Sequence, residues 1–157
     1  MIEVTQREHV LACLRAELPG ILASYPIMLA YLYGSVAEGY AMPTSDVDIA
    51  LVFNPSCQFN AYERMHVELD VADRIETGCG FTEVDVRGIN DAPLKAQGIV
   101  LTKGVLVYCR DEEFRVEFEV QTRKLYFDFQ PVLRMMQDSY FGHLETDLRR
   151  RGLLGDG

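Results

Sequence analysis

The chain has 157 residues, a hydrophobic fraction of 48%, a charged fraction of 25% and a formal net charge of −9. This composition is typical of one globular domain, and no apolar run approaches the roughly 20 residues that a membrane-spanning helix needs. Because so acidic a surface repels a phosphate backbone, we expect neither stable nucleic-acid binding nor membrane association.

The N-terminal segment carries acidic and polar residues within its apolar pattern, which is not typical of a signal peptide. We therefore expect a cytoplasmic protein. The four cysteines lie far apart in the sequence and form no C-x-x-C pair. Reduced, mostly packed thiols are expected rather than a zinc site or a disulfide framework.

The N-terminal third predicts a helix followed by a strand. Thr5 and Glu8 have the spacing of a capping box, and the helix that they begin is expected to end at Pro19-Gly20. The apolar run over residues 26–34 then predicts a buried strand that ends at a glycine.

The middle of the chain predicts alternating strands and helices. They are, in order, a strand over 46–53, a helix over about 62–78, a strand over 81–88, a helix capped by Asn90 or Asp91 that ends near Val100, and a strand from Val105.

The C-terminal third is ambiguous, because its apolar residues alternate at first as in a strand. Asp111 as an N-cap, with Glu112 and Glu113 in the first turn, favours a helix. Pro131 either kinks this helix or starts another one that ends near Arg150.

These elements predict an α/β protein with a small mixed β-sheet, flanking helices and a helical C-terminal extension. We expect a single domain over residues 1–157, with a core over about 5–125 and the extension over about 126–150.

Asp46 and Asp48 open the second predicted strand and lie on the same face of it. Asp85 lies on the polar face of the third predicted strand. If the two strands are neighbours, the three carboxylates converge and raise one another's pKa unless a cation neutralises them. Mg²⁺ prefers such oxygen ligands and leaves room for substrate phosphates. We therefore expect these aspartates to bind two Mg²⁺ ions for an in-line phosphoryl displacement.

Gly34 and Ser35 follow the first predicted strand and provide a second chemical feature. A glycine allows close approach of a phosphate to the backbone. Residues 35–39 are expected to form a helical turn whose free N–H groups attract anions. Ten residues separate Ser35 from Asp46.

The segment GSVAEGYAMPTSDVDIALVF resembles the motif of the polymerase-beta-like nucleotidyltransferase superfamily, which is Gly-Ser, ten residues and then Asp-x-Asp. Ser45 matches the frequent Ser-Asp-x-Asp form, and TEVDVRGIND stands where the third aspartate strand of the family belongs. The resemblance extends from about Val10 to Leu125. The short chain looks like the minimal nucleotidyltransferases, in particular the antitoxins of HEPN–MNT toxin–antitoxin pairs.

This resemblance implies a role for each matching residue. Asp46 and Asp48 would bind both metal ions, and Asp85 would bind the catalytic metal and help to activate the attacking hydroxyl. Gly34 and Ser35 would hold the β- and γ-phosphates of ATP, and Ser45 would also belong to the cofactor-binding residues.

The resemblance further implies that AMP is transferred from ATP to a tyrosine of a partner HEPN ribonuclease toxin, which inactivates the toxin. Two alternatives remain open. One is nucleotidyl transfer to a small molecule such as an aminoglycoside, and the other is an antitoxin that only binds its toxin.

Three further charged residues have a simpler interpretation. Glu83 shares the face of Asp85, but we interpret it as a solvated strand position rather than a fourth carboxylate of the site. Arg87 and Lys103 are interpreted as surface charges rather than as contacts to a triphosphate.

Overall fold

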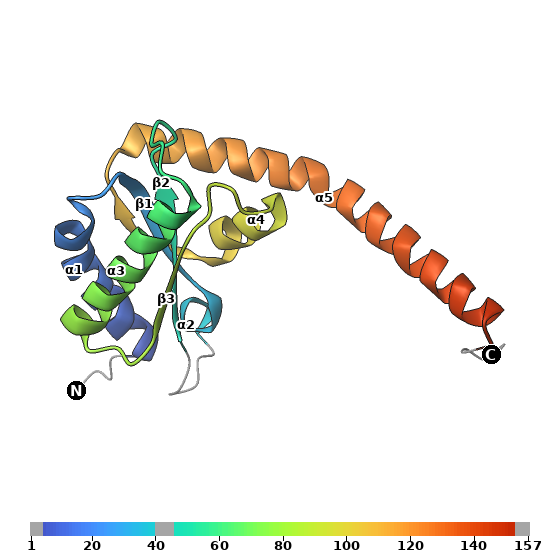
Figure 1. The fold of residues 1–157 in the computed structure, drawn as a ribbon, viewed down its shortest axis with the longest axis horizontal. Coiled ribbons are helices and arrows are strands. Elements are labelled where there is room, and N and C mark those ends of the chain that lie inside the picture. The colour runs from blue at the N-terminus through green and yellow to red at the C-terminus, as the bar shows by residue number, and fades with distance from the viewer. Residues whose placement is uncertain (1–4, 40–45, 153–157) are drawn as a thin grey trace.

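The computed structural model describes residues 5–39 and 46–152 and has a mixed β-sheet at its centre (Figure 1). The strands are β1 (Ile27–Tyr33), β2 (Val47–Phe53), β3 (Val84–Gly88) and β4 (Val105–Cys109). The helices are α1 (Gln6–Leu22), α2 (Gly34–Glu38), α3 (Ala61–Cys79), α4 (Leu94–Lys103) and α5 (Glu112–Arg150).

The strand order is β3-β2-β1-β4. Strand β1 pairs antiparallel with both β2 and β4, whereas β2 and β3 are parallel. The crossover between β2 and β3 contains α3, as a parallel connection requires. The expected α/β class with a small mixed sheet and a helical C-terminal region is therefore confirmed.

Helices cover both faces of the sheet, and the alternation of β2 explains how. Its odd-numbered positions, such as Ile49 and Leu51, are fully buried in the core beneath α1 and α3. Ala50 and Val52 lie on the opposite face and are buried in a second core with residues of α4. Asp48 belongs by its position to this second face, at the end of the strand where the apolar cover stops.

Helix α1 begins with the expected capping box between Thr5 and Glu8 but does not end at Pro19-Gly20. It continues through Pro19 to Leu22, so that expectation was wrong. Leu18 and Leu22 are fully buried, and this burial offsets the backbone hydrogen bond that a proline inside a helix removes.

The helix expected to be capped by Asn90 or Asp91 begins instead at Leu94, with Pro93 at the N-cap position. The Asn90 side chain is used elsewhere, because it accepts from the Phe53 backbone N–H at 2.8 Å and donates to the Phe53 carbonyl at 2.9 Å. Asn90 therefore joins the end of β3 to the end of β2.

The cysteines also differ from expectation. Cys13 on α1 and Cys79 at the end of α3 form a disulfide, whereas Cys57 and Cys109 are free thiols. Sequence separation hid this pair, because the two cysteines stand 66 positions apart and meet only when α1 packs against α3.

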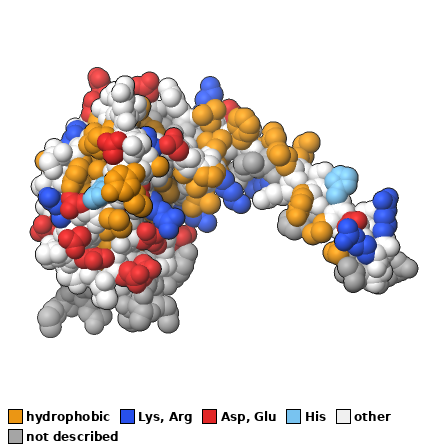
Figure 2. All heavy atoms as spheres, viewed as in Figure 1, with side chains coloured by type: hydrophobic (Ala, Val, Ile, Leu, Met, Phe, Trp, Pro, Cys, Tyr) orange, Lys and Arg blue, Asp and Glu red, His pale blue; other side chains and the backbone are white. Residues whose placement is uncertain are grey.

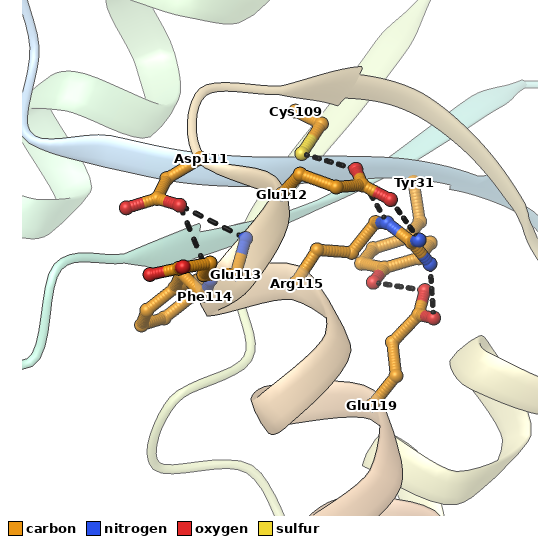
Figure 3. Close-up of polar contacts among 8 residues, drawn as sticks. All are labelled: Tyr31, Cys109, Asp111, Glu112, Glu113, Phe114, Arg115 and Glu119. Carbon is orange, nitrogen blue, oxygen red and sulfur yellow. Dashed lines mark hydrogen bonds and ion pairs between the residues drawn. The ribbon is translucent and has the colours of Figure 1, made fainter.

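A buried polar network joins the start of α5 to the sheet (Figure 3). The Tyr31 hydroxyl on β1 donates to Glu119 at 2.8 Å, and Arg115 donates to the same carboxylate at 2.7 Å. Arg115 also pairs with Glu112. Burial, followed by the hydrogen bond to Glu119, raises the pKa of Tyr31, so the phenol remains a neutral donor. Asp111 caps the helix as expected.

Helix α5 is one continuous element that contains Pro131, and it extends well past the sheet with a bend along its length (Figure 1). A proline is a common cause of such a bend. No helix within residues 5–39 and 46–152 is both long and apolar enough to cross a membrane.

Candidate active site

The candidate site lies at one end of the sheet, where β1 ends and where β2 and β3 begin. Asp48 of β2 is the register partner of Tyr33 on β1 and of Asp85 on β3. The parallel pairing of β2 with β3 therefore brings together two aspartates that stand 37 positions apart in the sequence. The structure therefore makes β2 and β3 neighbours and brings Asp48 beside Asp85, whereas Asp46 lies just before β2.

Asp46 precedes β2 and is exposed, next to Glu83 at the approach to β3. The Val47 backbone N–H donates to the Glu83 carbonyl at 3.1 Å, which aligns the two approaches. The charge of Asp46 and a hydrogen bond between the two carboxyl groups raise the pKa of Glu83. Glu83 is exposed to solvent, as expected from the sequence. It also belongs to this acidic group, because it interacts with Asp46.

Asp48 is the half-buried member of the group. Burial raises the pKa of its carboxyl group, and the charges of Asp85 and Asp46 raise it further, whereas Arg87 lowers it. The same environment raises the pKa of Tyr33, chiefly through burial and then through the charges of Asp48 and Asp85. The site therefore has an excess of negative charge that one arginine only partly offsets.

Gly34 lies against Asp48 at the junction of β1 and α2. Its φ of +76° is in the left-handed region, and a Cβ added there would overlap the Asp48 carboxylate oxygen Oδ2. Only glycine combines this conformation with this contact. Ser35 follows in the first turn of α2, so the helical turn that the sequence predicted is present.

Arg87 has a contact in this region that was not predicted from the sequence. Its guanidinium Nε pairs with Asp85 at 3.2 Å, so it is an ion-pair partner within the acidic group as well as an exposed charge. The signal in the sequence was the spacing of two residues along one strand, which puts Asp85 and Arg87 on the same face.

Lys103, interpreted from the sequence as a surface charge, pairs outside this group. Lys103 lies 3.9 Å from Glu38 at the end of α2. Ser45 lies outside the described residues. The proposed cofactor-binding role of Ser45 therefore stays a prediction from the sequence.

The carboxylates at this end of the sheet are candidate ligands for a divalent cation. Within the described ranges, no group of three or more His, Cys, Asp or Glu side chains is arranged as a ready-made metal site. Mg²⁺ does not require such a cage, because it usually uses one or two carboxylates together with water and substrate phosphates. Asp48 and Asp85 on adjacent strands, with a negative charge that Arg87 only partly offsets, fit that mode of binding.

We predict that ATP binds to this protein only when Mg²⁺ or Mn²⁺ is present, because the carboxylates and the triphosphate otherwise repel each other. Calorimetric titration of ATP with Mg²⁺ and with EDTA measures this directly. Equal ATP affinity in the two titrations would contradict a site in which a cation joins the carboxylates to the nucleotide.

Comparison with known families identifies the relatives of this fold. The family model described as "Polymerase beta, Nucleotidyltransferase" matches residues 17–113, which contain every described residue of the candidate site. A search of curated proteins finds no match.

Several solved structures share the fold. One is a toxin-antitoxin crystal structure with AMP-PNP, at a TM-score of 0.64 and 20% identity over 81% of this chain and 98% of that chain. A second is a complex of a tri-AMPylated HEPN toxin from Shewanella oneidensis with an MNT antitoxin. Its TM-score is 0.61 and its sequence identity is 18%, over 83% of this chain and 98% of that chain. A third is the toxin-antitoxin MntA-HepT. Its TM-score is 0.59 and its sequence identity is 18%, over 82% of this chain and 97% of that chain. At these identities the likeness shows the fold.

Proposed function

This chain belongs to the polymerase beta nucleotidyltransferase family, and from that membership we propose that it is an antitoxin that transfers AMP from ATP to a tyrosine of a partner HEPN ribonuclease. The observation that carries the proposal is the pairing of Asp48 with Asp85 across β2 and β3, with Gly34 packed against Asp48. Such a group of carboxylates beside a glycine turn suits nucleotide chemistry better than simple binding.

The antitoxin role is supported by the structural relatives. Two of them are described as a toxin-antitoxin with AMP-PNP and as an AMPylated HEPN toxin with its MNT antitoxin. The net charge of −9 is also suited to a basic protein partner, because opposite charges speed the encounter of two proteins.

In the proposed reaction, the tyrosine oxygen attacks the α-phosphorus of ATP, the bond from that phosphorus to the bridging oxygen breaks, and pyrophosphate leaves. Asp85 would accept the hydroxyl proton, and Asp46 and Asp48 would provide further carboxylates at the same end of the sheet. Mg²⁺, proposed as two ions, would neutralise the charge that these carboxylates and the phosphates bring together.

The glycine turn has its own part in the proposal. Gly34 leaves the space next to Asp48 free of any side chain, and Ser35 offers a hydroxyl and a backbone N–H to the β- and γ-phosphates. A HEPN partner would supply the acceptor hydroxyl, and its docking would hold that oxygen in line with the α-phosphorus.

We predict that mixing the protein with its partner HEPN ribonuclease, ATP and Mg²⁺ adds AMP to a tyrosine of the partner and silences its ribonuclease activity. Intact-mass measurement followed by peptide mapping locates the modification. The matched control is the Asp48→Asn protein, which is expected to bind the partner and to add no AMP.

The two alternatives give different results in the same assay. If the wild-type protein silences the toxin without any added mass, and Asp48→Asn silences it equally well, the protein acts by binding alone. If AMP appears on an aminoglycoside and never on the partner, the acceptor is a small molecule.

A further inference from the structure

The outer half of α5 carries an apolar surface that the rest of the fold does not cover. Among the described side chains of this helix, Thr122 is the last one that is buried. Large hydrophobic side chains that are exposed beyond it are Leu125, Phe127, Phe129, Val132, Met135, Met136, Tyr140 and Leu144. Figure 2 shows hydrophobic side chains along this projecting part of the molecule.

Four of these side chains form a stripe, whereas Phe127 lies about 160° around the helix from Leu125. Leu125, Phe129, Val132 and Met136 follow one another at intervals of four, three and four residues, the spacing of a helix that packs against another helix. The stripe contains a shallow groove. Its lining residues are Val132, Met135, Met136, Ser139, Tyr140 and His143.

A projecting helix of this kind needs a partner. Helices in proteins owe most of their stability to packing of an apolar face. A continuous exposed apolar stripe on a protein of ordinary composition marks a surface of association.

The charges around the stripe indicate which partner packs against it and in which orientation the two helices pair. Residues 126–157 contain five acidic and four basic residues, so they carry a charge of −1, and residues 1–125 carry −8 of the total −9. Within α5, Asp128 stands at the near end of the stripe, and Arg149 and Arg150 stand at the far end. Figure 2 shows this basic cluster at the tip of the molecule.

We propose that the outer half of α5 is the self-association surface of this protein, where two copies pair antiparallel about a two-fold axis near Ser139. This arrangement brings Asp128 of each copy next to Arg150 of the other, because the two positions are equally far from Ser139. It also keeps the two acidic bodies at opposite ends of the helix pair.

The same charges disfavour a parallel pair, although Arg149 and Arg151 also pair with Glu145 and Asp147 of their own helix. It would place the arginine clusters against each other and bring together two bodies that each carry −8. The antiparallel pair has neither conflict and buries the same stripe.

A second copy fits this surface better than a toxin does. The family model ends at residue 113, and 81% of this chain already matches 98% of the relative solved with AMP-PNP. About four fifths of this chain therefore matches almost the whole length of that relative. A basic partner would also be attracted to the acidic body rather than to the nearly neutral extension.

The first test is the mass of the full-length protein in solution, measured by light scattering or sedimentation at several concentrations. The wild-type protein is expected at twice the chain mass of 17.8 kDa. Met136→Glu should raise the dimer dissociation constant by about tenfold or more, because it places a charge within the apolar interface. Leu69→Glu on α3 is the matched control, because Met136 and Leu69 are both 64% exposed, and it should leave the dimer unchanged.

The second test examines the direction of pairing by disulfide formation, with the free thiols removed as Cys57→Ser and Cys109→Ser. Ser139→Cys lies near the proposed axis and should crosslink two copies readily. Arg134→Cys lies on a different face of α5, about 140° around a helix with 3.6 residues per turn, and should not.

Three outcomes would overturn the proposal. One is a wild-type mass of 17.8 kDa at all concentrations of the protein alone. This outcome includes the case in which the mass rises only after a HEPN ribonuclease is added. Another is a Met136→Glu protein that dimerises as well as Leu69→Glu. The third is crosslinking of Arg134→Cys at the rate of Ser139→Cys.

Discussion

Asp48→Asn is expected to lower AMP transfer by at least about 100-fold, the scale on which loss of one group that stabilises transition-state charge lowers kcat. Asparagine keeps the shape of the side chain and removes its charge, so the fold should survive. In the metal-free protein the variant should be as stable as the wild type or more stable, because it relieves repulsion from Asp85 and Asp46. Thermal unfolding in EDTA and transfer assays in Mg²⁺ measure the two effects separately.

The pH dependence of this stability difference has a definite sign. The fold raises the pKa of Asp48 above its ordinary value of 3.8, so the ionised carboxylate is less favourable in the folded state than in the unfolded state. The advantage of Asp48→Asn should be complete above the raised pKa, should decrease as the pH falls through it, and should vanish below 3.8. A variant that loses activity and metal-free stability together would show that Asp48 has a structural role instead.

Gly34→Ala is expected to have the second large effect, on both stability and activity. Its φ of +76° costs a non-glycine residue about 1–3 kcal/mol. The added methyl group would also overlap the Asp48 carboxylate, so either β1 or the Asp48 side chain must move. Because displacement of reacting groups by about 1 Å can cost about 100-fold in rate, we expect transfer to fall by that order.

Gly80→Ala is the matched control for this prediction. Gly80 ends α3 with a φ of +70°, and a Cβ there would meet no atom within 4 Å. Gly80→Ala should therefore show the conformational cost alone, with normal transfer activity. Denaturant unfolding and AMP transfer of the two variants measure the difference. If both variants lose the same stability and keep the same activity, the contact of Gly34 with Asp48 has no functional importance.

The sequence predicted the parts of the site that depend on short-range order. Successive side chains of a strand point to opposite faces, so the spacing of Asp46 and Asp48 alone predicted that both lie on one face of a strand over 46–53. In the structure β2 begins at Val47, so only Asp48 lies within it. The glycine of the Gly34-Ser35 pair indicated a backbone turn in the same way. The N-cap at Asp111 resolved the ambiguity of the C-terminal third, because a carboxylate that accepts from the first free N–H groups favours a helix over a strand.

Other features depended on packing between distant segments. The end of α1 was predicted incorrectly, because local preference disfavours Pro19 inside a helix whereas burial of Leu22 favours it. The Cys13–Cys79 disulfide was missed for a related reason, since only the contact of α1 with α3 brings the two sulfur atoms together.

The sequence by itself determined the fold class and the strand face of Asp48 and Asp85, because these follow from periodicity along one strand or helix. The residues of its motif carried the resemblance to a known family. Only the tertiary structure decided that β2 and β3 are parallel neighbours, that Asp48 therefore faces Asp85 while Arg87 pairs with it, and that the apolar stripe of α5 projects beyond the core. The physical reason is that strand order, ion pairs between strands and the limits of a core depend on how distant segments pack, and no local pattern encodes that packing.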